Sequence, residues 1–521
     1  MLKSRGVDVI FGIPGVHNQE MYRDIEEAGI THVLARHEQG AGFMADGYAR
    51  ATGKPGVAYV ITGPGLTNIM TPMGQAYSDS VSMLVISSCL NRADLGMGRG
   101  RLHEMRNQEA AAATVCDWSK TAMDAASAYG LIDRALLEFN VKRPLPKHIS
   151  VPIEVLEGTV AAPPADAPTL TTKAMPNSGE VDEVAARIKQ AKRPLFILGG
   201  GAADGFKAVR RVLAKTSAAS FCTYAGRGVA DLSDPLHFGA YLARPDSAAI
   251  IAQADCVVVL GSRLSEVDLW RDPLGHTCPL IRVDLDSEVF ADPQRSDLCI
   301  QSDIGAFAEQ LETALSDHSL TTSWAATDVQ TAQTRWRREV DAERPGILPI
   351  CELLREVLPQ DTLFYSDMTQ FAYVAKEVWP MPAPKHWHHP FGFGTLGYGL
   401  PAAVGGKIGC PEKPVVAIVG DAGFQYTMHE LGTAVELGLP LVILLWDNGK
   451  LKEIEDSMVG AQIAPNAVIA RNPDFLALAK AYGAAAAQPA TGTDLKAALT
   501  TALAHTGPTL LRLTPDIALD Q

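Results

Sequence analysis

The sequence predicts an α/β protein of three domains, each built on a mainly parallel sheet flanked by helices. Short apolar runs such as "PVVAIVG" and "LPLVILLW" have the length and the β-branched composition of buried strands. Stretches with helical spacing lie between these runs, and this alternation is typical of parallel sheets. With 521 residues, the chain is also too long for a single core.

The boundaries between the domains are expected where the alternation stops. The segment "VAAPPADAPTLTTKAMPNSG", residues 160–179, is rich in Pro, Ala and Thr and predicts an extended linker. A helical connector is expected between the second and third α/β blocks. We therefore predict an N-terminal domain at residues 1–160, a middle domain at 178–318 and a C-terminal domain at 345–521.

The amino-acid composition limits the kinds of binding partner and the cellular compartment that we expect. The net charge of −14 argues against nucleic acid or an anionic membrane surface as the main partner. The longest apolar runs have strand length, so we expect no membrane span. We expect no signal segment, and the eight cysteines include no C-x-x-C pair, which favours a reduced, cytoplasmic protein.

Two oxygen-bearing residues, Asp421 and Asn448, follow neighbouring predicted strands. A right-handed strand–helix–strand unit brings both to the same edge of the sheet, where such sheets bind ligands. With the backbone carbonyl of Lys450, they offer the hard oxygen ligands that Mg²⁺ takes beside a diphosphate. A tight turn at Gly420–Gly423 and the helix after it would present backbone amides to the anion. Two ordinary turns are the alternative interpretation.

These residues resemble the diphosphate–Mg²⁺ signature of thiamine diphosphate-dependent enzymes, except that Ala422 stands where the family usually has Gly. Further segments match the family in order and spacing: "GIPG" at 12–15, "THVLARHEQGAGFMADGYARATG" around Glu38, "ITGPGLTN" at 61–68 and "GFGTLGYGLPAAVGGKIG" at 392–409. The resemblance covers essentially the whole chain and is closest to the acetolactate synthase-like branch. It implies a pyrimidine-binding N-terminal domain and a diphosphate-binding C-terminal domain.

The resemblance implies that Glu38 contacts the aminopyrimidine ring of the cofactor. A protonated glutamate that donates to this ring favours an imino tautomer, whose nitrogen can remove the thiazolium C2 proton. The carboxyl must be buried to keep its proton near neutrality. The backbone of Gly394 is implied to accept a hydrogen bond from the same ring. Leu396 is implied to lie between the two rings of the cofactor and to keep it folded. The alternatives are a helix with Glu in its first turn, and simple core packing of Leu396.

The resemblance implies thiamine diphosphate and Mg²⁺ as cofactors. The metal ligands are implied to be Asp421, Asn448 and Lys450. The implied cofactor-binding residues are Pro14, Gly15, Glu38, Thr62, Gly63, Asn68, Thr369, Gly394, Thr395, Leu396, Gly420, Asp421, Ala422, Gly423, Asn448, Lys450 and Leu451.

The first part of the predicted substrate pocket is the segment "RLHEMRNQEA". Gln108 matches a Gln of acetolactate synthases, but Asn107 replaces their Phe. His103 and Glu104 precede it. For His103 the alternative is a hydrogen bond within the core, and for Glu104 a surface loop charge.

The helix after Asn448 departs from acetolactate synthases as well. Glu453, Ile454 and Ser457 stand where they carry Met, Val and Trp, so the pocket widens and gains a carboxylate. Carboxylates pair with a guanidinium through charge-assisted hydrogen bonds. Both segments resemble those of 5-guanidino-2-oxopentanoate (2-ketoarginine) decarboxylases, which implies release of 4-guanidinobutanal. The predicted catalytic residues are Glu38, His103, Gln108 and Glu453, and the predicted substrate residues are Glu104, Gln108, Glu453, Ile454 and Ser457.

Other interpretations stay open. Glu453 could lie on a solvated acidic helix face. The second functional hypothesis is an acetolactate synthase-like carboligase acting on pyruvate, and the third is a non-catalytic relative that only binds the cofactor. In the middle domain "LGGGAADG" is weak evidence for a nucleotide such as FAD.

The resemblance also implies self-association. In this family the glutamate and the metal motif of one active site come from two subunits, so a homodimer is the minimum and a homotetramer is common. The family usually has a further amphipathic turn or two before the segment that matches "LKSRGVDVIFGIPG". Either the true start lies upstream of Met1 or the first helix is short.

Overall fold

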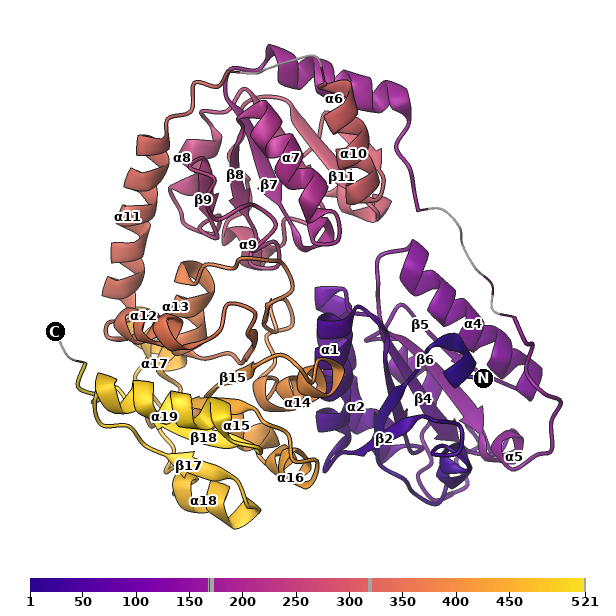
Figure 1. Cartoon of the computed structure of the whole chain (residues 1–521). Coiled ribbons are helices and arrows are strands. Elements are labelled where there is room, and N and C mark those ends of the chain that lie inside the picture. Colours follow the sequence, from indigo (N-terminus) through magenta and orange to yellow (C-terminus); the bar gives the residue numbers. More distant parts are fainter. Residues whose placement is uncertain (167, 169–172, 317–320, 520–521) are drawn as a thin grey trace. The chain divides into compact units, whose positions relative to one another are not determined.

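The structure, a computed structural model, describes residues 1–166, 168, 173–316 and 321–519. Its strands form three six-stranded sheets, and the strand pairings described are parallel. Figure 1 shows helices on both sides of these sheets. The predicted fold class is therefore confirmed. The chain divides into two compact units, one made of residues 1–169, 353–372 and 388–521, the other of 170–352 and 373–387.

The N-terminal sheet has the strand order β2-β1-β3-β4-β6-β5. Its strands are β1 Val9–Gly12, β2 Thr31–Leu34, β3 Gly56–Val60, β4 Met83–Cys89, β5 Trp118–Thr121 and β6 Lys147–Pro152. The helices are η1 Lys3–Arg5, η2 Gln19–Tyr22, α1 Glu38–Thr52, α2 Pro64–Asp79, α3 Gln108–Ala112, α4 Ala125–Val141 and α5 Ile153–Leu156.

Local sequence explains where the two helices nearest the predicted site begin. Helix α1 starts after His37, whose extended backbone and Nδ1 atom cap the helix at the amide of Gln39. Helix α2 starts with Pro64 after Gly63, which has a φ of 69° that favours glycine. The loops before these helices therefore end at defined points.

The C-terminal sheet has the strand order β14-β13-β15-β16-β18-β17. Its strands are β13 Leu363–Ser366, β14 Trp387–His388, β15 Val415–Gly420, β16 Val442–Trp446, β17 Ala485–Ala487 and β18 Thr509–Leu513. The helices are α12 Ile347–Val357, α13 Gln370–Val378, α14 Gly399–Gly409, α15 Asp421–Thr427, α16 Glu430–Glu436, α17 Lys452–Gly460, α18 Phe475–Tyr482 and α19 Gly492–Ala504.

Helices α1 and α14 cross closely within the first unit. A Cβ on Gly47 of α1 would lie 2.0 Å from the carbonyl oxygen of Ala402, and one on Gly405 of α14 would lie 1.9 Å from that of Met44. Phe43 and Tyr398 belong to one hydrophobic core that draws residues from both sheets. The N- and C-terminal domains of one chain are therefore packed as a single body.

The middle domain has the strand order β12-β11-β10-β7-β8-β9. Its strands are β7 Pro194–Leu198, β8 Ala219–Cys222, β9 His237–Gly239, β10 Cys256–Leu260, β11 Leu280–Asp284 and β12 Leu298–Gln301. Its helices are α6 Ser178–Gln190, η3 Gly200–Ala202, α7 Phe206–Thr216, α8 Ser247–Ile251, α9 Glu266–Leu269, η4 Ser287–Ala291, α10 Ile304–Ala314 and the connector α11 Ala326–Glu343.

The glycine-rich turn of the middle domain packs against its own chain. A Cβ on Gly199 would lie 2.1 Å from the carbonyl oxygen of Gly261, and one on Gly201 would lie 2.9 Å from the Cα atom of Gly261. The close packing of the two chain segments accounts for the glycines here, so no bound nucleotide is needed to explain them.

Two local predictions need comment. The separate turn expected at Gly420–Gly423 is wrong, because Asp421 is the first residue of α15. The helix expected after it is split in two by Met428 and His429. The described part of the expected linker has no helix or strand between residues 161 and 177, and positions 167 and 169–172 lie outside the described residues. Among the residues that the structure covers, no helix is both long and apolar enough to span a bilayer.

Candidate active site

The carboxyl ends of β15 and β16 meet at one edge of the C-terminal sheet. Gly420, the last residue of β15, pairs with Trp446, the last residue of β16. Asp421 follows directly, and Asn448 follows two residues after its strand. The structure therefore places the two predicted metal ligands at the same edge, as expected from the strand–helix–strand order.

Asn472, which sequence reasoning missed, bridges two carboxylates at this edge. Its Nδ2 atom lies 2.6 Å from Oδ2 of Asp421 and 2.8 Å from Oδ1 of Asp447. Burial, and the neighbouring Asp447, raise the pKa of Asp421, and the hydrogen bond from Asn472 offsets part of this. Arg512 pairs with the other oxygen of Asp447 at 2.7 Å. A cation beside Asp421 would stabilise the charged form of its carboxylate, which burial and Asp447 disfavour.

The turn after β16 is held by hydrogen bonds from its backbone amides to the Asn448 side chain and to Val468. The amide of Lys450 donates to Oδ1 of Asn448 at 3.2 Å, and the amide of Leu451 donates to the carbonyl of Val468 at 2.8 Å. The ammonium of Lys450 pairs with Glu455 at 3.0 Å, so the backbone carbonyl is the group of Lys450 that a metal could use. Gly449 has a φ of 71° and nothing within 4 Å of an added Cβ, which leaves open space at the turn.

A second missed residue, Asp367, supports two of the predicted segments at once. Its Oδ2 atom accepts from the amide of Gly397 at 2.8 Å, and a Cβ on Gly423 would lie 2.9 Å from the same oxygen. Burial raises the pKa of Asp367 to about 6. The carboxyl therefore fixes the loop that carries Leu396 against the start of α15.

The loop at 394–397 has an open side. Gly394 has a φ of 65°, and the nearest atom to an added Cβ is the Cε atom of Met368 at 3.7 Å. Leu396 is half-buried. Thr395 is buried, and its Oγ1 atom lies 3.0 Å from Oε1 of Gln75 on α2. Thr369 is buried beside Gly420, whose added Cβ would lie 3.1 Å from Oγ1 of Thr369, and Ala422 is half-buried.

Glu38 is the first residue of α1 and is 9% exposed. The Nδ2 atom of Asn68, on α2, lies 2.9 Å from its Oε2 atom. An added Cβ on Gly65 would lie 3.4 Å from Oε1, so the glycine turn leaves that side of the carboxyl accessible. Two residues that the resemblance assigned to the cofactor thus meet in a partly buried carboxyl–amide pair.

The turn at Pro14 and Gly15 is closed by Asn18, whose Oδ1 atom accepts from the amide of Gly15 at 2.7 Å. Pro14 is exposed. Thr62 is buried, and its Oγ1 atom lies 2.9 Å from Oγ of Ser88. Each predicted turn therefore has its own polar support within the N-terminal domain.

The side chain of Gln108 is buried and hydrogen-bonded to other residues of the N-terminal domain. Its Oε1 atom accepts from the amide of Gly63 at 3.1 Å, and its Nε2 atom lies 3.0 Å from the hydroxyls of both Ser87 and Ser150. Ser87 continues the network to Nε2 of His148 at 2.8 Å, and burial lowers the pKa of His148 to about 3. Gln108 therefore holds the Gly63 turn, and its predicted contact with substrate stays a prediction.

His103 pairs with His17, which the sequence analysis did not single out. The ring centroids are 5.0 Å apart in an edge-to-face arrangement. The Nδ1 atoms of both rings are buried without a hydrogen-bond partner in the described chain. His103 has a φ of 61°, and its carbonyl oxygen would lie 2.5 Å from a Cβ on Gly63. Strained backbone of this kind is concentrated at functional sites.

The predicted substrate carboxylates differ in their surroundings. The carboxylate of Glu104 accepts from the amides of Arg99 and Arg101 at 3.1 and 3.0 Å. Burial opposes ionisation of Glu104, but these backbone hydrogen bonds outweigh it and lower the pKa. Glu104 thus closes a loop, and its contact with a guanidinium stays a prediction. Glu453 is half-buried on α17, whereas Ile454 and Ser457 are exposed.

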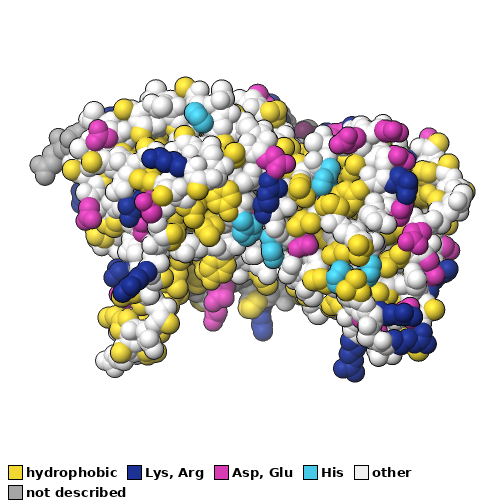
Figure 2. Space-filling model, turned by 90° about the horizontal axis from the view of Figure 1, so that it is seen from below, with side chains coloured by type: hydrophobic (Ala, Val, Ile, Leu, Met, Phe, Trp, Pro, Cys, Tyr) yellow, Lys and Arg dark blue, Asp and Glu magenta, His cyan; other side chains and the backbone are white. Residues whose placement is uncertain are grey.

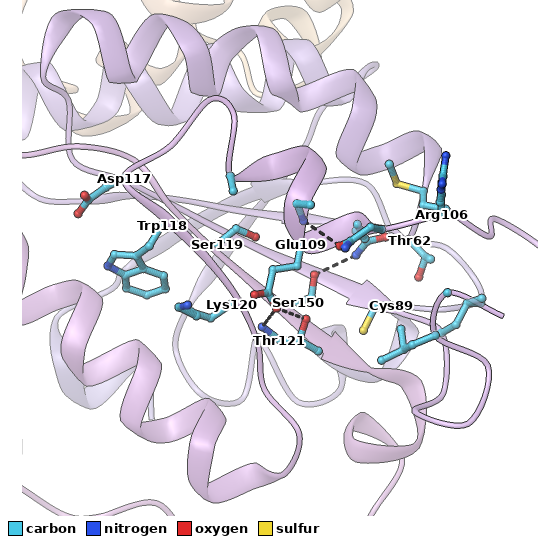
Figure 3. A pocket seen from close by; sticks show the side chains of 18 residues that line it. Thr62, Cys89, Arg106, Glu109, Asp117, Trp118, Ser119, Lys120, Thr121 and Ser150 are labelled. Atoms are coloured by element: carbon cyan, nitrogen blue, oxygen red, sulfur yellow. Dashed lines mark hydrogen bonds between the residues drawn. The ribbon is translucent and has the colours of Figure 1, made fainter. Parts of the chain in front are cut away.

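A cavity of about 640 Å³ lies at the carboxyl ends of β4 and β5. Thr62, Gln108 and Ser150 line it, as do the exposed cations Arg106 and Lys120. Figure 3 shows Glu109 pointing across it to Thr121, whose amide and hydroxyl it binds at 2.7 and 2.6 Å. The cavity therefore reaches the turn that Gln108 supports.

Comparison with known proteins decides the family. Residues 1–111 match the N-terminal thiamine pyrophosphate-binding domain of thiamine pyrophosphate enzymes, residues 181–311 match their central domain, and residues 367–513 match their C-terminal thiamine pyrophosphate-binding domain. The chain belongs to the thiamine pyrophosphate-dependent enzymes. The three matched segments fall on the three sheets, and the resemblance seen in the sequence is confirmed.

Individual relatives span nearly all of this thiamine pyrophosphate-dependent enzyme. A probable 2-ketoarginine decarboxylase of Pseudomonas aeruginosa is 42% identical and matches 98% of this chain and 92% of its own length. The large subunit of acetolactate synthase isozyme 2 of Escherichia coli is 28% identical and matches 99% of this chain and 94% of its own. An X-ray structure of a candidate thiamin diphosphate-dependent enzyme from Mycobacterium smegmatis has a TM-score of 0.82 at 22% identity, covering 100% of this chain and 98% of that one, which supports the fold.

Proposed function

We propose that the protein decarboxylates a 2-oxo acid to an aldehyde and CO₂, with 5-guanidino-2-oxopentanoate as substrate and 4-guanidinobutanal as product. The observation that carries the choice of substrate is the 42% identity, over nearly the whole chain, to a probable 2-ketoarginine decarboxylase. The departures from acetolactate synthases at Glu453, Ile454 and Ser457 point the same way.

The residues at the C-terminal sheet edge fit thiamine diphosphate with Mg²⁺. Asp421, Asn448 and the carbonyl of Lys450 are oxygen ligands of the kind Mg²⁺ takes, and open backbone at Gly449 and Gly394 leaves room for the group. When bound, thiamine diphosphate supplies a carbon nucleophile for the 2-oxo carbonyl and holds the electron pair that CO₂ leaves behind.

Glu38 would donate a hydrogen bond from its carboxyl group to the cofactor ring. Because the amide of Asn68 donates to Oε2, the oxygen left to face the cofactor is Oε1, which lies beside Gly65 of α2. Burial of the side chain keeps water from competing for that hydrogen bond. The pair therefore orients a carboxylic acid whose free oxygen can donate to the cofactor ring.

His17 and His103 are the candidate source of the proton that completes the aldehyde. Each has a buried Nδ1 atom without a partner, and they lie next to the Gly15 and Gly63 turns. Burial, and the proximity of His103, lower the pKa of His17, so a protonated His17 gives up its proton more readily than an ordinary histidine.

The guanidinium would be recognised by Glu453. Glu453 lies on α17, close after the turn that carries Asn448, so it is placed to act on the distal end of a substrate.

We further propose that two subunits complete each active site. Side chains around the predicted site are apolar and more than half exposed in the isolated chain: Val16, Met97, Leu102, Phe393, Tyr426, Ile454, Val459, Ile463 and Ile469. Figure 2 shows hydrophobic side chains gathered in patches on one face. Patches of this kind usually mark contact surfaces, and a second copy of the chain would cover them. Sedimentation analysis is expected to find a dimer or tetramer and no monomer at micromolar concentration.

An acetolactate synthase-like carboligase acting on pyruvate is the second candidate, supported by 28% identity to such a subunit, and a non-catalytic relative ranks below it. Product analysis separates the three. The enzyme is supplied with thiamine diphosphate, Mg²⁺ and equal concentrations of pyruvate and the guanidino acid. We expect 4-guanidinobutanal as the main product. Acetolactate as the main product would favour the carboligase, and no product from either acid would favour the non-catalytic relative.

A further inference from the structure

The N-terminus of α1, which carries Glu38, is held by a carboxylate from the C-terminal domain of the same chain. The Oε1 atom of Glu430 lies 3.0 Å from the backbone nitrogens of both Arg36 and His37. The Oε2 atom lies 3.1 Å from the nitrogen of Arg36 and 2.8 Å from Oγ1 of Thr433. The side chain of Glu430 has no exposed area, so these hydrogen bonds replace all of its contact with water.

The first turn of α1 leaves room for this carboxylate. A Cβ on Gly40 would lie 2.0 Å from Oε1 of Glu430 and 2.4 Å from its Cδ atom. Glycine inside a helix lowers stability by about 0.5–1 kcal/mol relative to Ala. Glycine at position 40 therefore makes the helix less stable, but it allows the carboxylate of Glu430 to approach the first turn.

We propose that Glu430 is a positioning residue that fixes the place of the Glu38 carboxyl. Glu430 binds the amides of the two residues that immediately precede Glu38, so any shift of those amides is passed on through the backbone. The acceptor oxygens of Glu430 also lie at the helix N-terminus, where the helix dipole favours negative partial charge. This inference rests on the proposed function, in which Glu38 is a catalytic residue.

Glu430 also connects Glu38 to the metal-binding edge of its own chain. Asp421 opens α15, and Glu430 opens α16, the next helix along. The start of α1 is therefore hydrogen-bonded to the helix that follows the predicted metal-binding edge.

The test compares Glu430→Ala with Glu430→Gln. The amide oxygen of Gln can keep the bonds at 3.0 Å to Arg36 and His37, whereas Ala removes the acceptor. For Glu430→Ala we expect kcat for CO₂ release to fall about 100-fold with KM nearly unchanged, because small displacements of a catalytic group have effects of this size. For Glu430→Gln we expect kcat within about threefold of the wild type.

The matched control is Asp124→Ala. Asp124 caps α4 in the same domain by accepting from the amide of Ser127 at 2.7 Å, so this variant also loses a carboxylate cap on a helix. We expect it to lower stability by about 1 kcal/mol and to leave kcat within about twofold. A loss of kcat equal to that of Glu430→Ala would mean that any destabilised helix cap impairs the enzyme, and would overturn the proposal.

A double variant gives the decisive readout. If Glu430 acts through Glu38, Glu38→Gln with Glu430→Ala is no slower than Glu38→Gln alone, whereas independent roles give multiplied losses. Multiplied losses, or wild-type kcat in a folded Glu430→Ala, would overturn the proposal. If Glu430→Ala does not fold, Glu430→Asp replaces it. This shorter side chain is expected to lose about 10-fold in kcat, and equal kcat for Asp and Gln variants would also overturn the proposal. Full activity in Glu38→Gln would instead refute the proposed function.

Discussion

The Nδ2 atom of Asn472 lies 2.6 Å from Oδ2 of Asp421, although 51 residues separate them in the chain. The same nitrogen reaches Asp447, which Arg512 holds from the other side. The orientation of the predicted metal ligand Asp421 is therefore set by a residue that would not itself touch the metal. Replacing partners of this kind typically lowers metal affinity about 10- to 100-fold.

Replacing Asn472 should weaken metal binding without unfolding the protein. For Asn472→Ala we expect the affinity for Mg²⁺, at saturating thiamine diphosphate, to fall about 10- to 100-fold, since the carboxylate of Asp421 loses its orientation. Calorimetric titration measures it. Asn140→Ala, which removes an exposed amide that bonds only the carbonyl of Leu136, is the control and should bind as the wild type does. Unchanged affinity in Asn472→Ala would contradict the role given to it.

Removing the acidity of Glu38 should stop turnover while leaving cofactor binding in place. Gln keeps an oxygen that can accept from Asn68 but has no proton to move, so we expect kcat to fall about 10²- to 10⁴-fold. Calorimetry with thiamine diphosphate should give an affinity close to that of the wild type. Glu27→Gln, at an exposed position in the same domain, is the control. Undiminished turnover in Glu38→Gln would show that another group handles this proton.

Neutralising Glu453 should act on the guanidinium alone. We expect Glu453→Gln to lower kcat/KM for 5-guanidino-2-oxopentanoate about 10- to 100-fold, the size of a lost charged hydrogen bond, and to change kcat/KM for 2-oxohexanoate by less than about threefold. Asp456→Asn is the control on the same helix, because Asp456 is exposed and pairs with Lys452. Equal losses for both substrates would remove the recognition role from Glu453.

Glu430 should make stability depend on pH in a defined direction. Burial raises its pKa from 4.5 to about 7, although hydrogen bonds from Thr433 and the backbone act the other way. Between these values the folded chain keeps a proton that the unfolded chain has released, so this contribution to stability is lost as pH rises through about 7. Glu430→Gln cannot titrate there.

Denaturant unfolding at pH 5 and at pH 8 measures this effect. The free energy of unfolding of the wild type, relative to that of Glu430→Gln, is expected to be lower at pH 8 than at pH 5. His37 and His429 lie close to Glu430 and remain in both proteins, so the comparison isolates the carboxyl. A difference that is constant across this range, or larger at pH 8, would show that Glu430 is ionised throughout.

The sequence was sufficient for the parts of the site that lie at strand ends. The buried runs before Asp421 and Asn448 fix two parallel strands, and the parallel order alone places both residues at one edge. Glu38 and Asn68 came from motifs whose order and spacing match the family, and the structure brings them within 2.9 Å. These predictions use local pattern and topology, which a single sequence carries.

The supporting residues could not be predicted in the same way. Asn472, Asp367 and Glu430 reach the site from loops and helices distant in sequence, and their contacts depend on how separate elements pack. Gln108 came from a matched motif, but its hydrogen bonds to Gly63 and Ser150 could not be read from the sequence. His17 had a weak signal, a histidine just after a glycine turn, which becomes visible only beside His103.

The most direct test of the central claim is CO₂ release from a panel of 2-oxo acids by the protein supplied with thiamine diphosphate and Mg²⁺. The panel comprises 5-guanidino-2-oxopentanoate, 2-oxoisovalerate, phenylpyruvate and pyruvate, with aldehyde and acetolactate both assayed. We predict the highest kcat/KM for the guanidino acid, with one aldehyde formed per CO₂. A preference for pyruvate with acetolactate as product would contradict the account.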